Sequence, residues 1–269
     1  MNKKLLVKGL FFYLIITIPV NIFDLCGKNH NLIASFLYLI PPFFVLFAVY
    51  SVIRQFGIHH EQGKAFLCVS FGFIFALIGE ITFLVLEFIL HKPPYPSLAD
   101  GFLFLGYFLF FIGFLSEIQA VTIKWTFAKI LIFTLCSVIF GLTIIYFGVF
   151  QAYNASHTLL RNIVDVTYGT SYFLLFITNT IVFFLVLEYK KGKLYIPWSY
   201  IFIGLALIFL GNIVYAQLQT EFMTKTFYYR YIDLLWFIGF LAISYGVYEI
   251  IWIISEVQRK ILKQLTNTN

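Results

Sequence analysis

The sequence predicts an all-α membrane protein, a polytopic bundle of eight transmembrane helices, and three observations support this prediction. Of its 269 residues, 61% are hydrophobic, 21% are aromatic and only 11% are charged, whereas soluble domains carry about 25% charged residues. The apolar residues form runs of about 20, the length of a helix that crosses hydrocarbon. These runs lack the strict alternation of membrane barrel strands. The composition therefore excludes a soluble domain and favours membrane-spanning helices.

Eight spans are expected in chain order, joined by connections too short to hold a soluble domain. The expected spans are 5–25, 32–53, 65–90, 100–118, 127–150, 164–187, 196–217 and 232–254. Residues 1–256 are expected to form one transmembrane domain, and residues 257–269 a cytoplasmic helical tail.

The distribution of positive charge predicts the orientation. With a cytoplasmic amino terminus, thirteen of the 18 Lys and Arg residues fall on the cytoplasmic side of these spans. Such an excess is what the positive-inside rule requires of a multi-pass protein of the cell membrane. Both termini are therefore predicted to be cytoplasmic. The net charge of +6 reflects this topology and does not indicate nucleic-acid binding.

An internal pattern recurs at the start of every second span. Its first residue is Asn31, Asp100, Asp165 or Asp233, at intervals of 69, 65 and 68 residues. The residue seven positions later is always aromatic: Tyr38, Tyr107, Tyr172 and Phe240. Seven residues are two helical turns, so both residues of a copy share one helix face.

The helices that precede two of these copies share a second pattern. Gly79-Glu80 lies 21 residues before Asp100, and Gly211-Asn212 lies 22 residues before Asp233. Because each unit is a two-helix hairpin that re-enters the membrane from the same side, the repeats are parallel and not inverted. The bundle is therefore predicted to be built from four parallel two-helix hairpins, of which the second and fourth agree best.

Polar residues inside the spans are the candidates for a binding site. An ionisable group at the membrane centre costs on the order of 2.5–3.5 kcal/mol, so such groups tend to be paired or functional. Glu80 is the clearest case, because it lies within a long apolar run. The pocket that senses a ligand or a proton is expected to comprise Glu80, Asp100, Tyr107, Asp165, Tyr172, Asn212 and Asp233.

Structural roles remain open for the same residues. Asp100, Asp165 and Asp233 occur where an acid stabilises the amino-terminal end of a helix. Ser97 with Asp100 also fits the Ser-x-x-acid capping box. Glu80 can equally be a group that hydrogen-bonds neighbouring helices together.

The sequence lacks the residue patterns typical of disulfide frameworks, metal or haem sites, phosphate-binding loops and nucleophilic catalysis. Cys26, Cys68 and Cys136 are scattered and odd in number, which predicts neither a disulfide framework nor a metal pair. The histidines fall in loops, away from the depth at which a bundle binds haem. No phosphate-binding loop or nucleophile motif occurs. The sequence therefore predicts no catalytic residue, no metal and no cofactor, although an intramembrane hydrolase that uses the carboxylates stays open as an alternative.

The stretch PPYPSLADGFLFLGY, residues 93–107, resembles the multi-helix membrane sensory regions that precede histidine kinase, PAS and GGDEF modules in signalling proteins. Those regions show a Gly-acid pair, a loop like PYPSLAD, a following Gly-Tyr, and a later Gly-Asp or Gly-Asn pair before an Ile-Asp-x-x-Trp helix. The matching residues here are Gly79-Glu80, 94–100, Gly106-Tyr107, Gly211-Asn212 and Ile232-Asp233 with Trp236. Asn212 departs from the acid that is usual at its position.

The resemblance implies an integral-membrane sensory domain that detects an external or in-bilayer signal and passes it through its last helix. Its implied partners, besides the lipid bilayer, are a cytoplasmic signalling kinase or cyclase. The spacing of Ile250, Ile254, Val257, Ile261 and Leu265 is close to a coiled-coil seam and adds a homodimer to these expectations. A small-molecule transporter built from the parallel hairpins is the alternative function.

Overall fold

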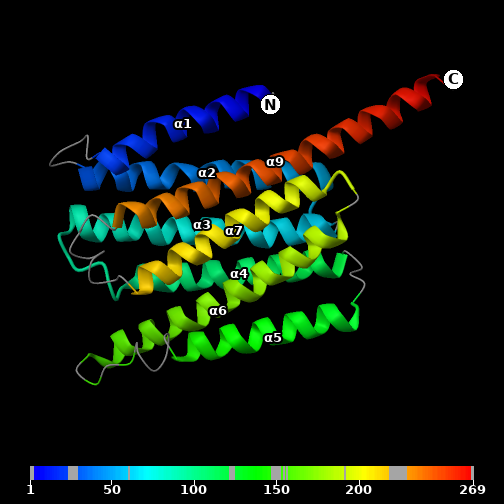
Figure 1. The fold of residues 1–269 in the computed structure, drawn as a ribbon. Helices are drawn as coiled ribbons and strands as arrows, with labels where there is room; N and C mark the ends of the chain where they lie inside the picture. Colours follow the sequence, from blue (N-terminus) through cyan, green and yellow to red (C-terminus); the bar gives the residue numbers. More distant parts are fainter. Residues whose placement is uncertain are drawn as a thin grey trace.

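The protein is described by a computed structural model that covers residues 3–23, 30–59, 61–120, 125–146, 153, 155, 157–190, 192–217 and 229–267. Within these residues the fold is all-α, as predicted, and its helices run side by side in one bundle (Figure 1). They are α1 (Lys3–Phe23), α2 (His30–Phe56), α3 (Glu61–Leu84), the π-helical η2 (Val85–Ile89), α4 (Leu98–Ala120), α5 (Phe127–Ile144), α6 (Leu159–Glu188), α7 (Tyr195–Gln217) and α9 (Tyr229–Asn267).

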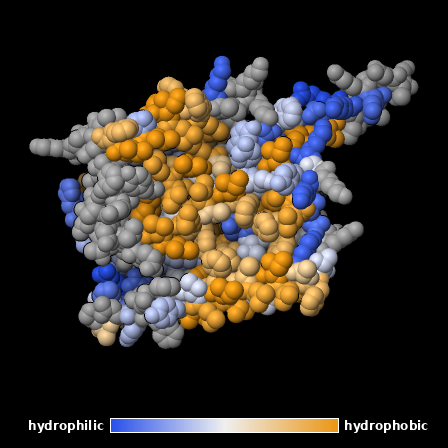
Figure 2. Space-filling view, viewed as in Figure 1, coloured by the Kyte–Doolittle hydropathy of each residue, from blue (hydrophilic) through white to orange (hydrophobic). Residues whose placement is uncertain are grey.

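Seven helices of the described chain are long and apolar enough to cross a membrane, so the protein is a multi-pass membrane protein. A helix suits hydrocarbon because it satisfies its backbone hydrogen bonds internally. The apolar part of α1, Lys8–Val20, is shorter than the other seven, and the eighth span stays a prediction. Figure 2 shows hydrophobic residues across the middle of the bundle and hydrophilic ones towards its two ends.

Two helix ends differ from the predicted ones by five or more residues, and the predicted end of a third helix lies outside the described part. The predicted span 65–90 is α-helical only to Leu84 and finishes in the π-helical turn η2. α5 is α-helical to Ile144 and residues 145–146 continue it as π-helix, while the predicted end at 150 lies outside the described part. α6 begins at Leu159 and not at 164, because the Thr158 side chain accepts a hydrogen bond from the Arg161 backbone N–H and so caps the helix earlier.

The apolar core lies between α2, α3, α4, α6, α7 and α9. Its fully buried side chains include Val49, Leu185, Trp198, Ile201 and Ile243. In contrast, α5 packs on α6 and has no buried residue. The sides of α5 that face away from α6 are therefore placed to contact lipid.

Two helix pairs, α3 with α4 and α7 with α9, approach each other closely through glycines. A Cβ atom on Gly106 would lie 2.9 Å from the Gly72 carbonyl oxygen, and one on Gly204 would lie 2.5 Å from the Gly239 carbonyl oxygen. Small residues let membrane helices pack at this distance, whereas a side chain would push the backbones apart. We call these contacts the glycine seams. They comprise Gly72, Gly79, Gly106 and Gly113 in α3/α4, and Gly204, Gly211, Gly239 and Gly246 in α7/α9.

The last helix extends beyond the bundle. α9 has 39 residues and continues without a break across the boundary between 256 and 257. At 1.5 Å per residue it is about 58 Å long, roughly twice what a membrane core requires. Its carboxyl-terminal part projects at the end of the bundle where α1 begins, so the two chain ends lie at the same end (Figure 1).

Candidate ligand-binding cavity

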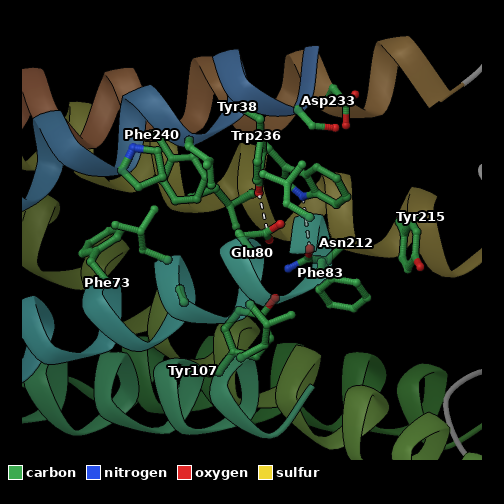
Figure 3. Close-up of a pocket in the computed structure, with 18 of the residues that line it drawn as sticks. Tyr38, Phe73, Glu80, Phe83, Tyr107, Asn212, Tyr215, Asp233, Trp236 and Phe240 are labelled. Atoms are coloured by element: carbon green, nitrogen blue, oxygen red, sulfur yellow. Dashed lines mark hydrogen bonds between the residues drawn. The ribbon is translucent and has the colours of Figure 1, made fainter. Parts of the chain in front are cut away.

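A cavity of about 250 Å³ lies between α2, α3, α4, α6, α7 and α9. It extends from Tyr95, in the connection between η2 and α4, to Phe240, roughly three turns inside α9. It therefore occupies the half of the bundle that faces away from the chain ends. Figure 3 shows its polar side chains converging from different helices.

Glu80 reaches the cavity from α3 and is partly buried. The residue before it, Gly79, belongs to the α3/α4 seam, where an added Cβ would lie 3.1 Å from the Ala99 carbonyl oxygen. Gly79 therefore holds α3 against α4, while Glu80, the next residue around the helix, points into the cavity (Figure 3). The Tyr38 hydroxyl of α2 donates a hydrogen bond of 3.5 Å to Glu80 Oε1. This bond joins α2 to α3 across the cavity.

Asn212 has the corresponding place on α7. The residue before it, Gly211, packs against the Trp236 ring of α9, where an added Cβ would lie 2.6 Å from Nε1. Trp236 Nε1 donates a hydrogen bond of 3.1 Å to Asn212 Oδ1. Asn212 is only 4% exposed, and its Nδ2 atom makes no hydrogen bond of ordinary geometry with the described residues, although its side chain interacts with the Tyr107 hydroxyl. The Tyr107 hydroxyl points towards this amide from the opposite wall (Figure 3).

Aromatic rings make up most of the remaining wall. Eleven of the 26 lining residues are Phe, Tyr or Trp. The Tyr38 ring lies 5.8 Å from the Trp236 ring and 6.1 Å from the Phe240 ring, in edge-to-face contacts, and Phe73 lies 5.9 Å from Phe240. Such rings offer both an apolar surface and negative faces to a ligand.

Asp100 lies one layer behind the cavity wall. It accepts a hydrogen bond of 2.6 Å from the Ser97 backbone N–H, and the Ser97 hydroxyl accepts one of 3.1 Å from the Ala99 backbone N–H. These bonds form the predicted capping box at the start of α4. The second Asp100 oxygen accepts a hydrogen bond of 2.6 Å from the hydroxyl of Tyr168, a lining residue on α6. Asp100 is thus both a helix cap and a support for the wall.

Asp165 holds the connection between η2 and α4. The hydroxyl of Tyr95 donates a hydrogen bond to Asp165 Oδ1, and His157 Nδ1 lies 3.8 Å from Asp165 Oδ2. The Arg161 guanidinium lies 6.0 Å from the centre of the Tyr95 ring. Burial raises the pKa of Tyr95 well above its usual range, so its hydroxyl keeps the proton that it donates. We call the Tyr95–Asp165 contact the latch, because it fixes residues 93–97 to α6 at the mouth of the cavity.

The structure brings most of the predicted pocket together. Glu80, Tyr107, Tyr172, Asn212 and Asp233 all line the cavity. Asp100 and Asp165 are not lining residues, but each is hydrogen-bonded to a tyrosine that is.

Helix capping applies to Asp100 alone among the three aspartates considered for it. Asp165 lies in the second turn of α6, whose cap is Thr158. Asp233 likewise lies in the second turn of α9, which begins at Tyr229. Both helices begin several residues before their aspartate, so neither aspartate is at the position of a helix cap.

Several lining residues were absent from the predicted pocket, notably Tyr38, Tyr95, Tyr168, Tyr215 and Trp236. Helical spacing was the available signal for three of them. Tyr168 follows Asp165 by three residues, Tyr215 follows Asn212 by three and Trp236 follows Asp233 by three, which places each pair on one face. Tyr95 had no comparable local signal.

The described wall offers carboxylates, hydroxyls, one amide and many aromatic faces. Within the described residues there is no group of three or more His, Cys, Asp or Glu placed to hold a metal ion. The arrangement therefore suits the non-covalent binding of a small organic molecule. Comparisons of the chain with protein-family models, with curated proteins and with solved structures found no match.

Proposed function

We propose that the protein is a membrane sensory domain that detects a signal molecule in this cavity and transmits its presence through α9 to a cytoplasmic output module or partner. One observation carries the proposal. α9 provides Asp233, Trp236 and Phe240 to the cavity wall and continues as one helix to Asn267, beyond the bundle. A change at the cavity therefore has a rigid connection to the carboxyl-terminal end.

The positions of charged residues support a cavity that faces outward. Basic residues gather at the end of the bundle that holds the chain ends, as the positive-inside rule expects of a cytoplasmic face. In the described part these residues are Lys8, Arg54, Lys64, Lys129, Lys190, Lys193, Arg259 and Lys260, whereas Lys92 and Arg161 lie towards the other end. The cavity lies in the opposite half, where it is accessible to an external or in-bilayer signal.

The two glycine seams favour a specific movement. α7 and α9 are held together by backbone contacts along their length, and so are α3 and α4. The cavity lies between these pairs, with Glu80 on one and Asn212 on the other. A ligand that bridges them would shift the equilibrium between two packing arrangements, provided that it binds one of them more tightly. The α7/α9 pair would then move as a unit and displace the tail.

The test is a distance measurement on the full chain in nanodiscs. Spin labels at Lys193→Cys and Lys260→Cys, in a chain whose native cysteines are replaced by serine, report the position of the tail relative to the α6–α7 turn. Small molecules from a library are first selected by thermal stabilisation that is lost in Glu80→Gln and kept in Glu256→Gln. Both variants remove one carboxylate charge, but Glu256 lies outside the cavity.

A selected molecule is expected to change the distance distribution between the two labels. An unchanged distribution with saturating ligand would overturn the sensory proposal. The same molecule should not accumulate in proteoliposomes; if it does, and the distances stay unchanged, the transporter becomes the better description.

A further inference from the structure

We propose that the cavity binds a lipophilic organic cation that also carries a hydrogen-bond acceptor, such as an amino alcohol or its ester with a protonated or quaternary nitrogen. The proposal names the class of signal for the sensory function above and rests on that function for its biological meaning. The binding chemistry itself rests on three features of the cavity wall: its charges, its rings and one unsatisfied amide.

The charges of the wall all have one sign. Glu80, Glu87 and Asp233 are carboxylates, and no Lys, Arg or His is found among the described residues that line the cavity. Between apolar helices the attraction of opposite charges is much stronger than in water, and so is the repulsion of like charges. The wall therefore selects a cation and rejects an anion.

Aromatic rings surround the carboxylate that lies deepest in the wall. Trp236, Tyr38 and Tyr107 lie close to Glu80 in Figure 3. The rings of Tyr38 and Trp236 meet at an interplanar angle of 63°, so they do not stack and cover each other's faces. A cation within about 6 Å of such a ring is attracted by its negative face. A carboxylate among several rings is the combination that binds quaternary ammonium groups.

The Asn212 amide calls for an acceptor on the ligand. The indole N–H of Trp236 is a donor only, so the atom of Asn212 that it contacts at 3.1 Å is the oxygen, and Nδ2 is turned the other way. This nitrogen is buried in the wall, where it interacts with the Tyr107 hydroxyl without making a hydrogen bond of ordinary geometry. A buried donor without a well-formed hydrogen bond is costly, and a ligand oxygen would satisfy it. The ligand is therefore expected to carry a hydroxyl, ether or carbonyl oxygen near its cationic nitrogen.

The cavity volume limits the size of the ligand. About 250 Å³ corresponds to roughly twenty water-sized positions. A free amine of this size fits, and so does the choline headgroup of a lipid that enters from the bilayer. Both sources present the same chemistry, and the experiment separates them.

The test uses benzyltrimethylammonium and its neutral carbon isostere, neopentylbenzene, on the full chain in phosphatidylglycerol nanodiscs. The two probes have the same shape and differ in the charge. Isothermal titration calorimetry is expected to show at least tenfold tighter binding of the cation. Equal affinities, or tighter binding of benzenesulfonate, would overturn the proposal.

Two matched pairs of variants locate the binding. Glu80→Gln should weaken cation binding about tenfold, whereas Glu256→Gln, the same change outside the cavity, should leave it unaltered. Trp236→Leu should weaken it by about three- to thirtyfold. Trp252→Leu, on the same helix but 42% exposed, should not. Thermal unfolding without ligand establishes that each variant is folded, and Trp236→Phe, which keeps a ring, should retain most of the affinity. Cation binding that is insensitive to both cavity variants would contradict this site.

Phosphatidylcholine, added to the nanodiscs, identifies the source. Competition with benzyltrimethylammonium supports a lipid headgroup as the ligand, and an absence of competition supports a free amine; both agree with a cation site. The labels at 193 and 260 separate this proposal from the sensory one. Cation binding without a distance change supports the cation site and contradicts the sensor. A distance change with a neutral or anionic molecule, but none with the cation, supports the sensor and contradicts the cation site.

Discussion

The hairpins α3/α4 and α7/α9 are built on the same seam and carry different chemistry. In each, a glycine pair brings the two backbones into contact, Gly72 with Gly106 and Gly204 with Gly239. A second glycine follows seven residues later on α3 and on α7, and the next residue faces the cavity. That residue is Glu80 in one hairpin and Asn212 in the other. The seam therefore sets the geometry of each hairpin, while the residue after the second glycine sets the chemistry that the hairpin presents to the cavity.

The hairpins also differ in what they connect. α4 ends at Ala120, whereas α9 continues to Asn267 and leaves the bundle. One hairpin therefore provides a wall that ends with the bundle, and the other provides a wall that is continuous with the carboxyl-terminal tail. The pair α5/α6 lacks such a seam in the described chain: Gly141 faces only the Phe173 ring, at 3.4 Å, and no residue of α5 is buried.

The largest effect is expected from replacing a seam glycine by alanine. Gly106→Ala and Gly204→Ala should each lower the free energy of unfolding by about 3 kcal/mol, because the new methyl group meets a backbone oxygen that cannot move aside. Gly101→Ala is the matched control in α4, since a Cβ there meets nothing within 4 Å. It should be neutral or stabilising, by up to about 1 kcal/mol. Unfolding in mixed micelles measures all three. If Gly106→Ala and Gly204→Ala lower the free energy of unfolding by different amounts, the two hairpins are not held together equally by their seams.

Asn212→Asp gives the α7/α9 hairpin the acid that the α3/α4 hairpin carries at Glu80. The variant buries another negative charge and should lose about 2 kcal/mol of stability, measured by the same unfolding transition. Its affinity for benzyltrimethylammonium should rise, because the cavity becomes more negative. If Asn212→Asp leaves both the stability and the affinity unchanged, this position does not face the ligand.

Tyr95→Phe removes the latch between the α3/α4 hairpin and α6. The loss should be about 1.5 kcal/mol, the value of a hydrogen bond to a charged acceptor. Because burial raises the pKa of Tyr95 in the folded protein, its contribution should be complete below about pH 10, the ordinary tyrosine value, and lost only as the pH rises through the higher folded value. The difference in stability between wild type and variant, measured from pH 6 to 9, should therefore be constant. A difference that disappears within this range would contradict the assignment of Tyr95 as the donor.

The removal of a helix cap should have the smallest effect, and Ser97→Ala should cost about 1 kcal/mol because it removes one cap from α4. Thr158→Ala removes the cap of α6, whose bond to the Arg161 N–H is longer at 3.3 Å, and should cost less. Amide hydrogen exchange in the first turn of each helix measures both losses. If Ser97→Ala also weakens ligand binding, the start of α4 contributes to the shape of the cavity mouth.

The sequence predicted the fold class because a helix that crosses the membrane must contain about 20 mostly apolar residues, and such runs can be counted along the chain. It also predicted the capping box, since Ser97 and Asp100 are close in sequence and act locally. Helix ends were less accurate: Thr158 is one of several polar residues before α6, and the pattern alone does not say which of them caps.

The site was predicted in part for the same reason. Glu80, Asn212 and Asp233 stood out as polar residues within apolar spans. The Trp236–Asn212 hydrogen bond and the latch did not, because they join residues that meet only after the helices have packed. Tyr95 and Asp165 are 70 positions apart, and no periodicity links them. The glycine seams are visible as a seven-residue spacing, but their partners depend on which helices become neighbours.

The participation of six helices in the cavity has a consequence for biosynthesis. The α3/α4 hairpin joins segments that are close in sequence, so it is able to assemble soon after it leaves the ribosome. The cavity is completed only when α9, the last described helix to be synthesised, takes its place beside α2 and α7. Ligand binding therefore requires α9. A ligand present during synthesis would bind the bundle that contains α9 and would not bind the shorter precursors that lack it.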